Sequence, residues 1–152
     1  MQTSLKALLP STPDVCLVLL KSWATEGEDR TSLHSDWNGD EVVKKIASTC
    51  PNTVVVTHSN GVNILPWADH PNVTAILAAH LPGQEAGSSI VDVLWGDVNP
   101  SGHLPYTIAK RESDYSFASI QNSTALQDTD DPTAWQSDFK EGVLIDYRVY
   151  FL

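Results

Sequence analysis

The chain has 152 residues and a formal net charge of −10, from nine lysines and arginines against nineteen aspartates and glutamates. This length suits one globular domain, and 41% hydrophobic residues without a long apolar run exclude a disordered or membrane-spanning chain. The negative charge disfavours binding to nucleic acid or to an anionic membrane surface, because both require a cationic face.

The first ten residues contain one lysine and an apolar stretch too short for a secretory signal before Pro10. We therefore expect no export signal in the chain as given. Two acceptor triplets for N-glycosylation, beginning at Asn72 and Asn122, favour secretion without showing it.

Three short apolar runs bounded by polar residues predict buried strands over residues 15–20, 53–57 and 73–79. The runs do not alternate between apolar and polar residues, so we expect both faces of the sheet to be covered. Cys16 lies in the first run and Cys50 precedes the second. Two buried or half-buried thiols are expected here in preference to a disulfide.

Helices are predicted between and after these strands. Over residues 38–47 the apolar residues fall on one helical face, and Asn38 with Glu41 predicts a capping box at the start. A turn or two of helix is expected over residues 61–67, where Pro66 limits its length. Residues 84–95 repeat the helical pattern, with acidic Glu85 in the first turn and Gly96 as the stop.

The alternation of strands and helices predicts an α/β fold: a doubly wound, mostly parallel sheet with helices on both faces, a flavodoxin-like three-layer sandwich. We expect its core to span about residues 12–109 and to include a short strand over 104–108. A polar excursion is expected over about 110–140, where large apolar residues are few. An edge strand is expected to return over about 141–148.

Ligands of open α/β sheets bind at the carboxyl ends of the strands. The loop after the first strand places Glu26, Glu28 and Asp29 beside Arg30 and Trp23. Neighbouring carboxylates raise each other's pKa, and the cation of Arg30 acts in the opposite direction. Such a mixed environment can adjust the pKa of a general acid. A solvated acidic loop with a local arginine pair is the alternative explanation.

Other kinds of site find little support. The loop lacks the glycine-rich patterns of nucleotide binders, and its negative charge opposes a phosphate. The histidines and cysteines show no metal spacing, so we expect neither a metal nor a cofactor. No glycine precedes Ser59 as a nucleophile elbow requires. His58 and His80 end predicted strands, where backbone bonding is the simpler explanation, and Gln84 and Glu85 suit either a ligand or a helix start.

Several stretches together resemble a known family. They are Lys21-Ser22-Trp23-Ala24-Thr25-Glu26-Gly27, Asp29-Arg30, Pro66-Trp67-Ala68-Asp69-His70-Pro71-Asn72, Leu81-Pro82-Gly83-Gln84-Glu85 and Gly96-Asp97-Val98-Asn99-Pro100-Ser101-Gly102. From about residue 14 to residue 148 the chain resembles the C-terminal α/β sandwich domain of glycoside hydrolase family 3, in particular that of fungal-type β-glucosidases.

The resemblance implies retaining hydrolysis in a cleft between two domains, where a TIM barrel supplies an aspartate nucleophile and this domain supplies the acid/base. By match to the family pattern the acid/base is Glu26, with Glu28 as the fallback because the alignment across this loop can slip by two residues. It also implies a secreted, extracellular glycoprotein that takes part in polysaccharide and cellulose degradation. The substrates it implies are terminal β-D-glucosyl residues of cello-oligosaccharides and similar β-glucosides.

Four features depart from the family pattern. Glu28 stands where the family has a small or apolar residue, and Val149-Tyr150-Phe151-Leu152 replaces an expected His-Phe. Ser35-Asp36-Trp37 matches the nucleophile's triplet on the barrel, but it precedes a predicted helix here and we interpret it as coincidence. The barrel and the fibronectin-like domain are not in this chain.

A retaining mechanism needs two carboxyl groups, so we expect the chain alone to hydrolyse little or nothing. The alternative function is a non-catalytic fragment, or a module that binds carbohydrate or a partner domain. In either case the surface that normally packs on the barrel predicts an exposed apolar patch and self-association.

Overall fold

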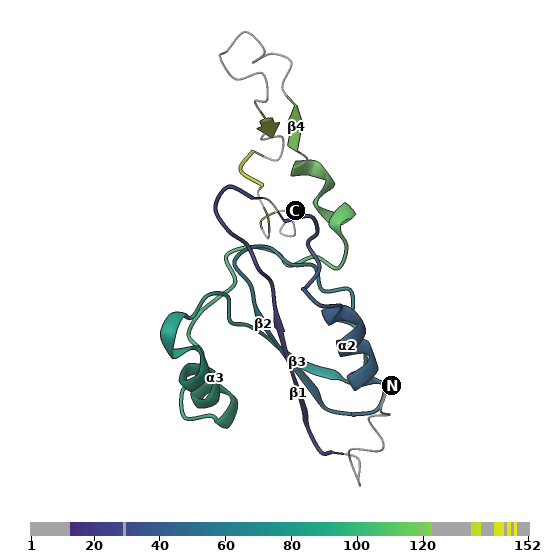
Figure 1. Cartoon of the computed structure of the whole chain (residues 1–152), viewed down its shortest axis with the longest axis vertical. Helices are drawn as coiled ribbons and strands as arrows, with labels where there is room; N and C mark the ends of the chain where they lie inside the picture. Colours follow the sequence, from purple (N-terminus) through teal and green to yellow (C-terminus); the bar gives the residue numbers. More distant parts are fainter. Residues whose placement is uncertain are drawn as a thin grey trace.

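The computed structural model describes residues 13–28, 30–118, 120–122, 135–137, 142–144, 146 and 148. Its centre is a parallel sheet of β1 (Cys16–Lys21), β2 (Thr53–His58) and β3 (Val73–Ala78), in the order β1-β2-β3 (Figure 1). The three predicted strands are thus confirmed, and each of their ends agrees to within one residue.

Two α-helices accompany the sheet, α2 (Gly39–Ala47) and α3 (Ala86–Trp95), and Figure 1 shows them on opposite sides of it. The short 3-10 helix η1 (Gly83–Glu85) leads into α3, and Gly96 ends α3 in a left-handed conformation with φ 83°, as the sequence predicts. The parallel sheet with helices on its two sides confirms the predicted fold class.

The core lies between the sheet and α2. Its buried cluster joins residues of β1, α2, β2 and the loop after β2: Val18, Leu20, Val43, Val55, Leu65 and Trp67. Val18 and Leu20 of β1 belong to this cluster, and the residues between them face the other side of the sheet, because alternate residues of a strand face opposite sides. Burial of this face holds the carboxyl end of β1 in a fixed place.

The expectation that both sheet faces are covered is correct for β2 and wrong for β1 and for β3, in which Thr74, Ala75 and Ile76 are exposed. Leu17 and Leu19 are 44% and 62% exposed, and no residue of α3 is buried. The uninterrupted apolar run of β1 therefore reflects one face packed on α2 and one open apolar face.

The start of α2 differs from the predicted capping box. Asn38 adopts a left-handed conformation with φ 57° and its side chain makes no cap hydrogen bond. Gly39 is needed there, because a Cβ on it would lie 2.8 Å from Ser35 Cβ and 3.0 Å from Leu20 Cδ2. The expected capping box is therefore not formed, and the segment before α2 packs closely against β1 at Gly39.

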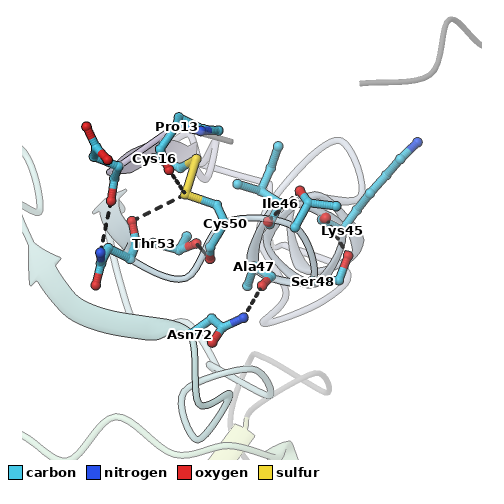
Figure 2. Close-up of a disulfide and its surroundings, with 12 residues drawn as sticks. Pro13, Cys16, Lys45, Ile46, Ala47, Ser48, Cys50, Thr53 and Asn72 are labelled. Carbon is cyan, nitrogen blue, oxygen red and sulfur yellow. Dashed lines mark hydrogen bonds between the residues drawn. A yellow bond between two sulfur atoms is a disulfide. The ribbon is translucent and has the colours of Figure 1, made fainter. Parts of the chain in front are cut away.

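The expectation of free thiols is wrong, because Cys16 and Cys50 form a disulfide with a Cα–Cα distance of 6.3 Å (Figure 2). The parallel register places Cys16 beside Thr53, and Cys50 comes three residues earlier in the chain. Strand pairing thus brings together two cysteines that are 34 residues apart in the sequence.

Other predicted elements are not formed. Residues 61–65 are not helical and residues 66–69 form a turn, while no strand forms over residues 104–108. In place of that strand, the Ala109 carbonyl accepts a hydrogen bond from Leu65 N–H and Ala109 N–H donates to the Tyr115 hydroxyl.

The polar excursion contains the 3-10 helix η2 (Glu112–Ala118) and an antiparallel pair of β4 (Ile120–Asn122) and β5 (Trp135–Ser137). In the expected edge strand at 141–148, Gly142 and Val143 form a turn and Asp146 lies in a helical turn. The described part of this segment is therefore not a strand, and its remaining residues lie outside the structure's description.

Candidate functional site

A cleft of about 340 Å³ opens at the carboxyl end of β1. It is formed by the loop after β1 and by the segment that leads into α2. Its lining residues are Trp23, Glu28, Arg30, Thr31, Ser32, His34, Ser35, Asp36, Trp37 and Asn38. The cleft thus lies where open α/β sheets bind their ligands.

Glu26 lies at the tip of a tight turn beside this cleft. Thr25 and Glu28 form an isolated antiparallel bridge, and Gly27 has a φ of 81° at the third position of the turn. A positive φ at this position is typical of a type II turn and favours glycine. The turn leaves Glu26 and Glu28 exposed, and only Glu28 is among the lining residues of the cleft.

Backbone hydrogen bonds anchor the stem that leads into this turn. Ser22 N–H donates to the His58 carbonyl at the end of β2 at 2.9 Å, and Trp23 N–H donates to Asp36 Oδ2 at 2.8 Å. The Asp36 carboxylate of the Ser35-Asp36-Trp37 triplet therefore orders the loop after β1.

Arg30 follows the turn and is held by neutral oxygens. Its guanidinium donates to the carbonyls of Val62 and Ser32 at 3.1 Å each, and to Asn63 Oδ1 at 2.9 Å. Asp29 lies outside the described residues. Arg30 thus joins the acidic loop to the loop after β2.

Two indole rings border the cleft. Trp37 is 80% exposed and has a positive φ of 55°, and the Lys21 ammonium lies 4.1 Å from its ring centroid. Trp23 is also exposed. Carboxylates next to open aromatic faces can transfer protons and pack against apolar surfaces of a ligand.

The contacts of three other predicted candidates, His58, His80 and Glu85, lie outside the lining of this cleft. The His58 carbonyl accepts the Ser22 N–H bond, and His80, with a φ of 52°, contacts Tyr106 at 5.8 Å between ring centroids. Burial raises the pKa of Tyr106, and the nearby Tyr115 raises it further. Glu85 accepts a hydrogen bond from Ser88 Oγ at 2.7 Å, which supports its interpretation as part of a helix start.

Of the two glycosylation candidates, Asn72 Nδ2 donates to the Ala47 carbonyl at 2.7 Å and Asn122 is the last residue of β4. Among the described residues, no three His, Cys, Asp or Glu side chains gather as a possible metal site. Within the same part of the chain, no helix is long and apolar enough to cross a bilayer.

Sequence analysis missed Asn63, which contacts Arg30, Ser22 and Ser35. A polar residue directly before the apolar pair Ile64-Leu65 was the available signal. A motif search does not detect it, because its partners come from distant loops.

The sequence model of the glycosyl hydrolase family 3 C-terminal domain matches residues 3–147. The Aspergillus terreus protein named "Probable beta-glucosidase G" is 59% identical over 142 residues, which is 93% of this chain and 17% of that protein. The Aspergillus niger protein named "Probable beta-glucosidase M" is 48% identical over 144 residues, with 91% and 18% covered.

Two solved structures are also similar. A glycoside hydrolase family 3 β-glucosidase from Neurospora crassa gives a TM-score of 0.69 at 40% identity, covering 88% of this chain and 16% of that one. A β-D-glucoside glucohydrolase from Trichoderma reesei gives 0.66 at 37% identity, covering 91% and 19%. The chain therefore spans less than one fifth of the length of these relatives.

Proposed function

Because this chain belongs to glycosyl hydrolase family 3, as a C-terminal domain of that family, we propose that it forms part of a β-glucosidase and supplies its acid/base carboxyl group. The complete enzyme hydrolyses terminal non-reducing β-D-glucosyl residues with retention of configuration. Short cello-oligosaccharides are the substrates that we propose.

The observation that carries the proposal is the exposed turn that presents Glu26 beside the cleft at the carboxyl end of β1. A general acid has to reach the glycosidic oxygen of a bound substrate. The residues on both sides of this turn are held by hydrogen bonds, while the carboxyl group at its tip is exposed. Such a carboxyl group can reach a substrate that is bound largely by another domain.

The second carboxyl group is proposed to come from a barrel domain. Retaining glycosidases place a nucleophile and an acid/base about 5 to 5.5 Å apart on either side of the scissile bond. Glu26 and Glu28 belong to one turn of the chain, so neither is suited to face the other across a sugar ring. A family 3 barrel is therefore the partner, and the chain alone is expected to be inactive.

Glu28 is the alternative acid/base, since it lines the cleft. The Glu26→Gln and Glu28→Gln variants separate the two when the chain replaces the matching 142 residues of the Aspergillus terreus relative. Loss of the acid/base slows hydrolysis of a poorly activated β-glucoside by about 10²–10⁴-fold. On 2,4-dinitrophenyl β-glucoside, whose leaving group needs no proton, such a variant still forms the glycosyl-enzyme, and azide rescues turnover by attacking it without general base assistance.

We expect this loss and this rescue for Glu26→Gln, and only a small effect for Glu28→Gln. Rescue confined to Glu28→Gln would move the role to Glu28, and rescue of neither variant would reject this loop as its source.

Extracellular location, glycosylation at Asn72 and Asn122, and a part in cellulose degradation belong to the same proposal. Asn72 Nδ2 carries two hydrogens, and the bond to Ala47 uses one of them. Secretion of the full-length protein by a fungal host, followed by glycosidase digestion and mass spectrometry, tests both glycosylation sites.

A carbohydrate-binding module is the second candidate, because the exposed rings of Trp23 and Trp37 border the cleft. Titration of the chain alone with cellotetraose, followed by tryptophan fluorescence, separates the two functions. Saturable binding without any gain of activity on addition of a barrel favours the module.

A further inference from the structure

We propose that Asn63 is a positioning residue for the acid/base turn, because its amide joins the two stems of that turn. The inference rests on the proposed function of Glu26 or Glu28 as the acid/base. Asn63 itself is buried and acts on the turn through Ser22 and Arg30.

Asn63 is buried, with 4% of its surface exposed. Its Oδ1 accepts a hydrogen bond from Arg30 Nη2 at 2.9 Å. Its Nδ2 donates to Ser22 Oγ at 2.6 Å and to Ser35 Oγ at 3.4 Å. The donors and the acceptor of this side-chain amide are therefore all engaged.

These partners lie on both sides of the turn in the sequence. Ser22 precedes the Thr25–Glu28 bridge and Arg30 follows it, so a single buried side chain fixes both stems. Ser22 and Ser35 are themselves buried. In a buried network, loss of one partner leaves the others unsatisfied, which favours rearrangement of the loop.

Misplacement of an acid/base has a specific kinetic effect. A displacement of about 1 Å can reduce the rate by about 100-fold. The loss is large only where the leaving group needs a proton, as in cellobiose. A 2,4-dinitrophenolate leaves without protonation, so kcat/KM for its β-glucoside does not depend on the acid.

The test uses the whole chain in place of the matching segment of the Aspergillus terreus relative. Asn63→Leu keeps a similar volume and removes the hydrogen bonds. We expect kcat/KM for cellobiose to fall by about 10- to 100-fold, while that for 2,4-dinitrophenyl β-glucoside changes by less than about threefold. Asn63→Asp keeps the acceptor for Arg30, and the serine hydroxyls can rotate to donate to it, so activity toward cellobiose should largely return.

Val43→Ala is the matched control. Val43 is fully buried in the core under the sheet, and its truncation destabilises the fold without touching the loop. It should lower both kcat/KM values equally, if at all. Equal losses on both substrates in Asn63→Leu would overturn the positioning role.

A measurement on the 152-residue chain keeps the inference testable without catalysis. In Asn63→Leu, amide hydrogen exchange at Ser22 and Trp23 should accelerate at least tenfold beyond any acceleration in Val43→Ala. Unchanged exchange there would contradict the inference. An unmodified hybrid that is inactive on both glucosides would instead reject the proposed function.

Discussion

The indole N–H of Trp67 donates to Asp40 Oδ1 at 2.9 Å, and the other carboxylate oxygen of Asp40 contacts His34 Nδ1. Trp67 is 2% exposed, so its N–H has no access to water and depends on this acceptor. The pair joins the turn after β2 to the first turn of α2. It thereby fixes the segment that lines the cleft.

Asp40→Ala should destabilise the chain by about 1–3 kcal/mol, because it leaves the buried indole N–H without an acceptor. Asp40→Asn keeps an acceptor oxygen and should cost less than half as much. Chemical denaturation followed by tryptophan fluorescence measures both variants. Equal costs for Ala and Asn would show that the Trp67 hydrogen bond contributes little.

The Cys16–Cys50 disulfide should stabilise the fold by about 2–5 kcal/mol, because it closes a loop of 34 residues in the unfolded chain. Urea unfolding with and without reductant measures this difference. The double variant Cys16→Ser, Cys50→Ser should match the reduced protein and should not respond to reductant. A midpoint that is the same in both redox states would show that the bond contributes nothing.

Gly27→Ala should destabilise the loop by about 1–2 kcal/mol, because an alanine is strained at a φ of 81° even where no neighbour lies within 4 Å. Gly102→Ala is the matched control, since Gly102 also has open space around it and is not among the positive-φ glycines. Urea unfolding and cellobiose hydrolysis by the barrel-containing hybrid measure the two effects. A Gly27→Ala variant that equals Gly102→Ala in both would contradict the turn geometry.

The open face of β1 should make the isolated chain self-associate, because Val15, Leu17 and Leu19 expose apolar side chains there. Leu17→Lys with Leu19→Glu should shift the chain toward monomer in sedimentation velocity. Leu81→Lys, which removes an apolar side chain that is 73% exposed elsewhere, is the control. If the unmodified chain stays monomeric at high concentration, the prediction that the open face of β1 drives self-association is wrong.

The fold could be predicted where local pattern decides structure. The apolar run of β2 and the glycine at position 96 mark a buried strand and a helix end without reference to the rest of the chain. The exposed face of β1 was missed because the sequence of a strand does not show which neighbouring elements pack on it.

Features that depend on pairing across the chain were missed. The disulfide requires the register that sets Cys16 beside Thr53, and the Asn63 network requires the loops after β1 and β2 to meet at the carboxyl ends of the two strands. Asn38 fits the sequence pattern of a cap, but its backbone is left-handed and its side chain makes no cap hydrogen bond, which the sequence pattern does not show. The position of the acidic loop was predictable, because the first strand carries it to the ligand-binding edge.

The most direct test of the account is hydrolysis of cellobiose, whose leaving group needs a proton, by the chain alone and by the chain mixed with a family 3 barrel domain, with Glu26→Ala as the control. We predict no turnover by the chain alone, turnover in the mixture, and loss of that turnover in Glu26→Ala. Robust hydrolysis by the purified chain, or turnover in the mixture that Glu26→Ala leaves intact, would contradict the assignment of the acid/base to this domain at Glu26.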